Sequence, residues 1–175
     1  MKNRLPFLLK SLLFMLIINA FGNKLIGQEE KFKALFIYNF TKYIEWPLDM
    51  GGDNFNIVVM GNIELANQLM DISSKMKVGS KKMNVIISNS IDEIPNCQIV
   101  IFGSSKTEQL AAFAQKVKGN KVLIVCDKDK SCQKGACINF IKKNGNLNYE
   151  ISKSNMDGAN LKYNSTLTAL GSLLD

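Results

Sequence analysis

The chain contains no histidine, and this limits the chemistry that its side chains can perform. Histidine is the usual general base of enzymes and the commonest metal ligand in proteins. The sequence also has no Gly-x-Ser-x-Gly motif around a nucleophilic serine and no evident pair of catalytic carboxylates. We therefore expect a protein that works by binding rather than an enzyme, with no metal or other cofactor.

A short loop is the best candidate for a ligand site. It contains Gly103, Ser104 and Ser105 and lies where an apolar run gives way to a helical pattern, as phosphate-binding loops do. A Walker motif would require glycine where the chain has Val100 and Ser105. Ser105 and Glu108 also have the spacing of a capping box, so capping explains these residues without a ligand. Capping is the preferred interpretation, and a small-anion site is the alternative.

Four cysteines allow several disulfide arrangements. Cys132 and Cys137 lie five residues apart around a glycine, where a tight crosslink is feasible. If the apolar runs containing Cys97 and Cys126 form neighbouring parallel strands, these two residues lie roughly 16 Å apart, which is too far for a bridge. We expect a Cys132–Cys137 disulfide and a buried, unpaired Cys97, with Cys126–Cys132 as the competing bridge.

The first 27 residues have the pattern of a secretory signal peptide. Lys2, Arg4 and Lys10 precede the apolar run 12–18, and 13 uncharged residues separate Lys10 from Lys24. A helix of that length spans about 20 Å, less than the roughly 30 Å of a bilayer core. We expect a signal peptide over residues 1–27, cleaved just before Gln28 with cleavage after Gly22 as the alternative, and a periplasmic domain over 28–175. A retained membrane anchor is the alternative.

Much of the net charge of +7 belongs to this leader. Residues 1–27 contain four basic and no acidic residues, so the remaining chain has 18 basic and 15 acidic residues and a net charge of +3. The remaining lysines are spread along the sequence, whereas a nucleic-acid-binding protein concentrates them on one face. We therefore expect no binding to nucleic acids.

The most apolar stretch after the leader runs from residue 32 to 46, where nine of fifteen side chains are large and either apolar or aromatic. Five of them share one helical face: Phe32, Leu35, Phe36, Phe40 and Tyr43. Pro47 predicts that the helix ends at Glu45 or Trp46. Because other sides of the helix are also apolar, we expect a buried helix, with a partner-binding surface as the alternative. The candidates for partner contacts are Phe36, Tyr43 and Trp46.

The rest of the chain alternates between apolar runs and helical patterns. The predicted strands are 55–60, 83–87, 97–102 and 121–126, and the predicted helices between them are 63–75 and 105–117. This alternation is typical of a mostly parallel sheet flanked by helices. Residues 136–141 and 147–151 then alternate around Asn144-Gly145, which predicts a hairpin. The fold class is α/β and Rossmann-like, with a C-terminal hairpin and a closing helix over 155–174, broken near Gly158.

Three segments together resemble one protein family. They are residues 36–47 (FIYNFTKYIEWP), residues 135–140 followed by 147–151, and residues 159–165 with the leucine-rich end that follows. In this order behind a signal peptide, they resemble the YfiR-like family of small periplasmic regulatory proteins.

The resemblance implies a regulator that represses an inner-membrane diguanylate cyclase by binding its periplasmic sensing domain. It also implies a disulfide, and Cys132 and Cys137 lie where such a bridge is expected. An outer-membrane lipoprotein could modulate the repression. Whether the protein forms a homodimer is left open by the resemblance. The run 55–60 has no cysteine to pair with Cys97, so a second family-like disulfide is not expected. The alternatives are an input subunit for a sensor kinase and a small-molecule-binding protein with a pocket near Gly61 and Gly103.

Overall fold

The computed structural model describes residues 27–46 and 52–174. Apart from Gly27, the predicted signal peptide lies outside the described residues, and so does Pro47. In the described ranges, no helix combines the length and the apolar composition needed to cross a membrane.

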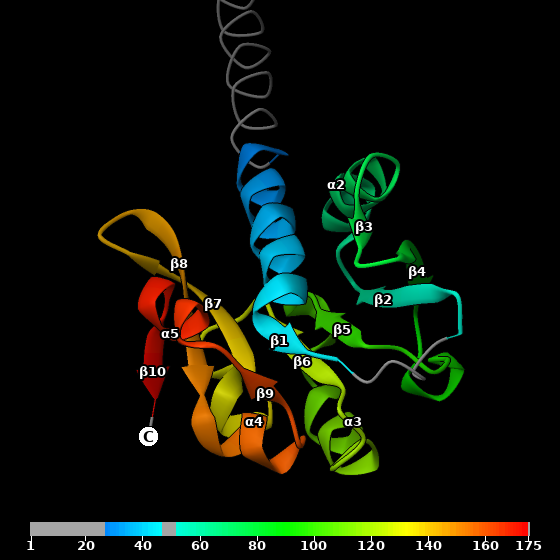
Figure 1. Cartoon of the computed structure of the whole chain (residues 1–175). Coiled ribbons are helices and arrows are strands. Elements are labelled where there is room, and N and C mark those ends of the chain that lie inside the picture. The colour runs from blue at the N-terminus through cyan, green and yellow to red at the C-terminus, as the bar shows by residue number, and fades with distance from the viewer. Residues whose placement is uncertain (1–26, 47–51, 175) are drawn as a thin grey trace, which may run out of the picture.

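The fold is a curled sheet between two layers of helices (Figure 1). The strands are β1 (Ile44–Glu45), β2 (Asn54–Met60), β3 (Lys77–Val78), β4 (Lys81–Ser88), β5 (Ile99–Phe102), β6 (Leu123–Cys126), β7 (Ile138–Lys143), β8 (Asn146–Ser152), β9 (Lys162–Tyr163) and β10 (Ser172–Leu174). The helices are the first helix (residues 27–43), α2 (Ile63–Ser73), α3 (Leu110–Lys116), α4 (Lys153–Gly158) and α5 (Ser165–Leu170). Short 3-10 turns are η1 (Ile91–Glu93), η2 (Ser104–Lys106) and η3 (Ser131–Lys134).

The main sheet has eight strands in the order β10-β8-β7-β6-β5-β2-β4-β3. Strands β4, β2, β5, β6 and β7 are parallel, and the first four of them are the apolar runs predicted to form a parallel sheet. Every residue of β5 and β6 is buried, because helices cover both faces there. The strand order reverses between β2 and β5, where Met60 pairs with Phe102. At such a reversal, α/β proteins usually bind their ligands.

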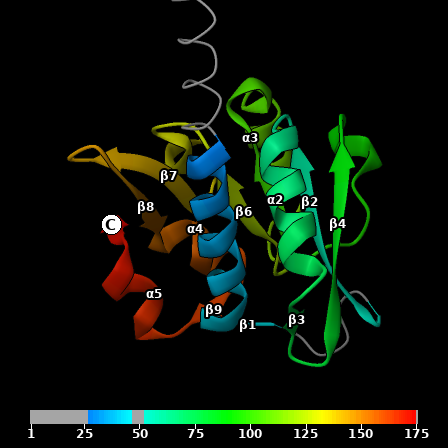
Figure 2. The same cartoon turned by 90° about the horizontal axis from the view of Figure 1, so that it is seen from above.

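The two helical layers pack on opposite faces of this sheet. Figures 1 and 2 show the first helix and α2 on one face and α3 and α4 on the other. The β7–β8 hairpin turns through Asn144 (φ 53°) and Gly145 (φ 79°), the pair of positive φ values that a type I′ turn requires. The hairpin prediction is therefore confirmed.

The first helix presents a different face to the sheet from the one predicted. Its buried side consists of Glu30, Lys33, Ala34, Ile37, Phe40 and Thr41. Of the five residues predicted to share a face, only Phe40 is fully buried, whereas Phe32 is 49% and Leu35 is 41% exposed. The helix also ends earlier, at residue 43, because β1 follows and Tyr43 O accepts a hydrogen bond from Asn164 N.

The closing helix predicted over 155–174, with a break near Gly158, is confirmed at the break, where α4 ends, and is wrong beyond it. The segment forms α4, β9, α5 and β10 in succession. Ser152 caps α4, whereas Asn160 adopts a positive φ of 56° that ends the helical path. Asn164 then caps α5 through Thr166 N, and β10 joins the sheet beside β8. The leucines therefore occupy short elements with different directions instead of one helical face.

Candidate functional site

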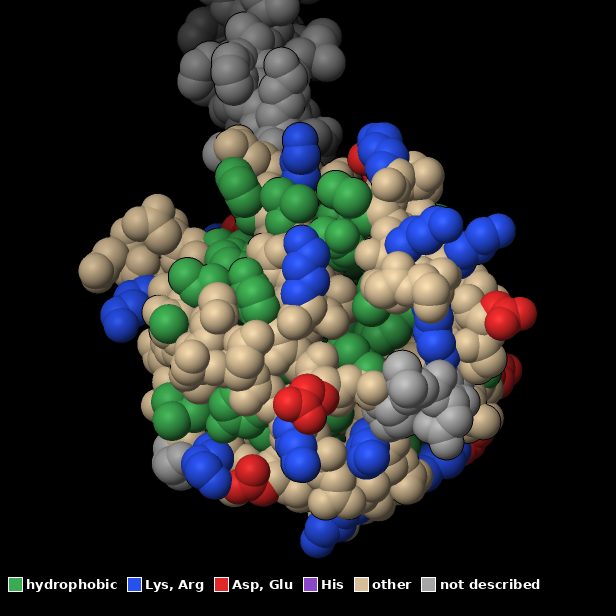
Figure 3. Space-filling model, viewed as in Figure 1, with side chains coloured by type: hydrophobic (Ala, Val, Ile, Leu, Met, Phe, Trp, Pro, Cys, Tyr) green, Lys and Arg blue, Asp and Glu red, His purple; other side chains and the backbone are tan. Residues whose placement is uncertain are grey.

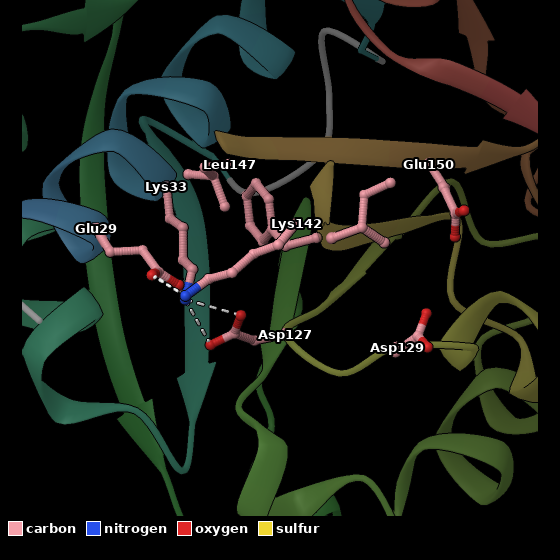
Figure 4. Close-up of a pocket in the computed structure, with 9 residues that line it drawn as sticks. Glu29, Lys33, Asp127, Asp129, Lys142, Leu147 and Glu150 are labelled. Atoms are coloured by element: carbon pink, nitrogen blue, oxygen red, sulfur yellow. Dashed lines mark hydrogen bonds and ion pairs between the residues drawn. The ribbon is translucent and has the colours of Figure 1, made fainter. Parts of the chain in front are cut away.

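A buried lysine at the start of the described chain contacts three carboxylates. Lys33 Nζ lies 3.0 Å from Glu29 Oε1, 2.8 Å from Glu30 Oε1 and 2.9 Å from Asp127 Oδ1. The Lys33 side chain is only 5% exposed. Figure 4 shows Glu29, Lys33 and Asp127 pointing toward one another from the first helix and the end of β6. We call Glu29, Glu30, Lys33 and Asp127 the charge cluster.

Elements distant in sequence position these four side chains. Glu29 and Glu30 lie one helical turn before Lys33, whereas Asp127 directly follows β6 and donates its backbone N–H to Phe102 O at 2.9 Å. Asn62 Nδ2 joins them from the end of β2, at 3.1 Å from Glu30 Oε2 and 3.4 Å from Asp127 Oδ2. The charge cluster therefore ties the first helix to the carboxyl ends of β2 and β6.

The charges stabilise one another. Burial on its own would lower the pKa of Lys33, but its hydrogen bonds to Glu30 and Asp127 more than compensate and raise it. A hydrogen bond from Lys142 lowers the pKa of Glu29, with a further contribution from Lys33. Lys142 Nζ lies 2.8 Å from Glu29 Oε2, so the contact also links the β7–β8 hairpin to the first helix. Lys33 and Glu29 thus stay charged at neutral pH.

A cavity of about 480 Å³ opens beside the charge cluster (Figure 4). Its polar wall includes Glu29, Lys33, Asp127, Asp129, Lys142 and Glu150, and its apolar wall is Phe140, Ile141 and Leu147. None of these nine residues is a serine, threonine, cysteine or histidine. The arrangement therefore offers charged and apolar contacts for binding.

Sequence reasoning missed this site. Residues 29, 30 and 33 carry opposite charges at helical spacing, and Asp127 directly follows a predicted strand, so both signals were readable. Neither signal shows that the two segments meet, because that depends on how the first helix lies across the sheet.

The predicted ligand loop performs a packing role at the reversal point of the sheet. Gly103 N donates to Met60 O at 2.7 Å, and a Cβ on Gly103 would lie 2.6 Å from Gly61 O. Ser105 Oγ donates a hydrogen bond to Gly61 O at 3.2 Å. The predicted capping box does not form, because Ser105 lies in η2 and not at the start of α3. Ser104 belongs to η2, and α3 begins only at Leu110 without a side-chain cap. None of these loop residues lines the cavity beside Lys33.

The three partner candidates from the sequence are half-buried. Phe36 packs on Tyr149 with ring centroids 5.4 Å apart. Trp46 packs edge-on against Phe55 at 5.1 Å and donates its Nε1–H to Thr41 O at 3.0 Å. Tyr43 packs partly buried against the core. Their role in partner binding stays a prediction.

Two apolar side chains on the outer side of the first helix are more exposed than these three candidates. Phe32 and Leu35 lie on that side, next to Phe36. Figure 3 shows hydrophobic side chains gathered over this part of the molecule, with lysines between them. We call Phe32, Leu35, Phe36 and Tyr43 the outer helix surface.

All four cysteines are buried, free thiols in the structure. Strands β5 and β6 are parallel neighbours with Cys126 opposite Phe102, so Cys97 lies five residues away along the sheet, as predicted. Burial raises the pKa of Cys132 to about 12 and that of Cys137 to about 11. The Cys132–Cys137 bridge stays a prediction, and the raised pKa values disfavour the thiolate that disulfide exchange requires.

A family model described as YfiR/HmsC-like covers residues 30–172, from the first helix to the start of β10. No curated protein matches the chain.

Proposed function

This chain belongs to the YfiR/HmsC-like family of periplasmic regulators, and we propose that it represses an inner-membrane diguanylate cyclase by binding that enzyme's periplasmic sensor domain. It acts by docking and carries out no reaction of its own. The same mode of binding would serve the alternative partner, a sensor kinase. An outer-membrane lipoprotein that binds the regulator would release the cyclase by competing for it.

The outer helix surface is the observation that supports docking. A first helix packed only as core would bury its large apolar groups, yet Phe32 is 49% and Leu35 is 41% exposed. Exposed aromatic and leucine side chains on one helix face are the contacts by which amphipathic helices bind grooves in other proteins.

The charge cluster makes this surface rigid before a partner arrives. Lys33, on the buried side of the first helix, is tied to Asp127 at 2.9 Å, while Glu29 is tied to the hairpin through Lys142. A surface that is already ordered loses less conformational entropy on binding. The interactions on the buried side therefore favour docking on the outer side.

The proposal is tested by affinity capture from crosslinked cell envelopes. Wild type is compared with a Phe32→Lys/Leu35→Lys variant, with Cys132→Ser, and with Leu173→Lys as control. Leu173 is 50% exposed and lies on β10, the outermost strand of the sheet. We expect wild type and the Leu173 variant to recover a transmembrane cyclase, the helix variant to lose it, and Cys132→Ser to recover less. Equal recovery by the helix variant and the control contradicts the proposal.

The second candidate function is small-molecule binding. One observation favours it: the cavity beside Lys33 has the size of a ligand site and combines charged groups with an apolar wall. Its test is a thermal-shift screen of charged metabolites on wild type and on Glu150→Gln, which alters the cavity wall. A stabilising ligand whose effect is lost in the variant supports this function, whereas equal shifts in both proteins contradict a site in this cavity.

A further inference from the structure

A row of three side chains on the exposed side of the first helix has a cation at each end. Lys31, Leu35 and Lys42 have the spacing i, i+4 and i+11, which places them in line along the helix. All three are exposed, and Lys42 Nζ lies 4.3 Å from the centre of the Tyr38 ring. The two lysines lie about three helical turns, or about 16 Å, apart. We call Lys31, Leu35 and Lys42 the cationic row.

The cationic row borders the aromatic part of the outer helix surface on one side. Phe32, Phe36 and Tyr43 repeat the same spacing one residue later, so they form a second, parallel row. Phe36 packs on Tyr149 of β8, and Tyr149 donates its hydroxyl hydrogen to Leu167 O of α5. Helix α5 has no charged residue. The aromatic row therefore faces the hairpin and α5, and the cationic row lies along the other border.

Strand β3 lies on the cationic side of the first helix and adds a further lysine. Tyr38 Oη donates to Lys77 O at 3.5 Å, which places β3 beside the cationic row. Lys77 is exposed and lies opposite Lys82 in the pairing of β3 with β4. Figure 3 shows lysines beside and between the hydrophobic side chains of this face.

The described acidic residues around the cationic row leave it with a net positive charge. Glu64 of α2, whose Oε1 lies near Gly27, accepts a hydrogen bond from Gln68 Nε2 at 3.0 Å and opposes the row at one end. The other carboxylates each have a lysine of their own nearby: Glu29 contacts Lys33 and Lys142, Asp71 contacts Lys75, Glu45 lies opposite Lys162 across β1 and β9, and Asp53 adjoins the partner of Lys82.

The lysines of the hairpin do not form a matching border on the aromatic side. Lys142 Nζ is held by Glu29 Oε2 at 2.8 Å. Lys143 lies next to the turn, opposite Asn146, and Figures 1 and 2 show the tip of the hairpin directed away from the first helix. The outer helix surface is thus an apolar stripe with cations along one border.

We propose that the occupant of the outer helix surface is an acidic amphipathic α-helix of the partner protein. Its apolar stripe packs on Phe32, Leu35 and Phe36, and its carboxylates lie along the cationic row. Two helices packed at a shallow angle share the same rise per residue, so the carboxylates that reach Lys31 and Lys42 are about 11 residues apart in the partner. The inference rests on the docking proposed for this surface and adds the chemistry of the partner segment.

A phospholipid surface also combines apolar and anionic groups, but this face matches it less closely. A helix that lies in a membrane surface carries lysine or arginine over a broad polar side that stays in contact with water. Here the side opposite the outer helix surface is packed on the sheet through Ala34, Ile37 and Phe40. Two lysines on one border add little attraction to an anionic membrane, whereas they are enough to orient a protein helix.

Site-specific photo-crosslinking in cells identifies the segment that covers the surface. Leu35→p-benzoylphenylalanine places the crosslinker at an exposed position within the cationic row, and mass spectrometry sequences the peptide joined to it. We expect an amphipathic segment whose apolar stripe is bordered by carboxylates. The same crosslinker at Leu173, on the outermost strand β10, should not join that segment. A segment without acidic residues at this border, lipid as the only product, or no crosslink at all overturns the inference.

The identity of the crosslinked protein separates this inference from the proposed function. An acidic helix that belongs to a protein other than a diguanylate cyclase upholds the inference and contradicts the proposed function. A cyclase segment without the acidic border contradicts the inference and supports the proposed function.

Charge reversal tests the role of the lysines, with a synthetic peptide of the crosslinked segment as the probe. Lys31→Glu and Lys42→Glu are each expected to raise the peptide Kd at least about fivefold at low ionic strength, and added salt should weaken wild-type binding. Lys118→Glu is the matched control, because Lys118 is exposed just after α3, on the opposite face of the sheet. Replacing the facing carboxylate of the peptide by lysine should restore its affinity for Lys31→Glu. An equal Kd for all three variants and wild type overturns the inference.

Cosedimentation with vesicles of phosphatidylglycerol and phosphatidylethanolamine tests the membrane directly. Wild type is expected to stay in the supernatant at physiological ionic strength. If wild type sediments with the vesicles and Lys31→Glu/Lys42→Glu does not, the surface binds lipid and the inference is overturned.

Discussion

Lys33 Nζ lies 2.9 Å from Asp127 Oδ1, which joins the first helix to the carboxyl end of β6 across 94 residues of sequence. The contact is shielded from water, because the Lys33 side chain is 5% and the Asp127 side chain is 16% exposed. The first helix is thus held on the sheet by a buried ionic contact as well as by Ala34, Ile37 and Phe40. It is this attachment that leaves Phe32 and Leu35 facing outward.

Replacing Lys33 by methionine should destabilise the protein strongly. The variant leaves the buried Glu30 and the half-buried Asp127 without their cation, and breaking a buried pair in this way costs about 3 to 5 kcal/mol. Urea unfolding followed by circular dichroism measures the free energy of unfolding. The exposed Lys31→Met serves as control and should change it by less than about 0.5 kcal/mol. Equal stability of the two variants would show that the ionic contact does not hold the helix.

Acidification should weaken the contact between Glu29 and Lys142. The pKa of Glu29 is lower in the folded than in the unfolded protein, so its contribution to stability is complete above the unfolded value of about 4.3. The contribution is lost as the pH falls through the lower, folded pKa. Because Glu29 is 31% exposed, we expect a difference of at most about 1 kcal/mol between wild type and Glu29→Gln at pH 7. This difference should shrink below pH 4 in a pH series of urea titrations, and a constant difference contradicts the assignment.

Gly103 should not tolerate a side chain. A Cβ at this position would meet the Gly61 backbone, with O at 2.6 Å and C at 2.7 Å. We expect Gly103→Ala to lower the free energy of unfolding by about 1 to 3 kcal/mol through overpacking. Gly158→Ala is the matched control. A Cβ added at Gly158 would meet no neighbouring atom within 4 Å, and alanine is the better helix former. If both substitutions are equally tolerated, the loop is not held against Gly61 as described.

The predicted Cys132–Cys137 bridge should stabilise the folded protein by about 2 kcal/mol, since it closes a short loop. Reduction with dithiothreitol is expected to lower the free energy of unfolding by that amount in wild type and in Cys97→Ser. Cys132→Ser should not respond to reduction. If mass spectrometry of the oxidised protein finds all four cysteines alkylated as free thiols, the bridge does not form and the prediction is wrong.

The parallel strands and the hairpin could be predicted from local sequence. Apolar runs predict buried strands wherever helices cover both faces, and Asn144-Gly145 supplies the two positive φ values of the turn. The last twenty residues could not be predicted in this way. Leu167 and Leu170 repeat at helical spacing, but Asn164 and the pairing of β10 with β8 divide the segment.

The candidate site could not be predicted from local sequence patterns either, but for a different reason. The first helix is apolar on several sides, so its sequence does not show which side contacts the sheet. Lys33 is polar and resembles a surface residue, and its burial depends on Asp127, which only the tertiary structure brings close. A lysine with carboxylates one turn earlier, taken alone, suggests a solvated ion pair.

The central claim is that the protein restrains a cyclase through the outer helix surface, and cellular cyclic-di-GMP measures it most directly. Deleting the gene should raise the cyclic-di-GMP level, and wild type or Leu173→Lys supplied in trans should lower it again. Phe32→Lys/Leu35→Lys, exported at the same level and equally stable, should fail to lower it. An unchanged level after deletion, or full complementation by the helix variant, would contradict the account.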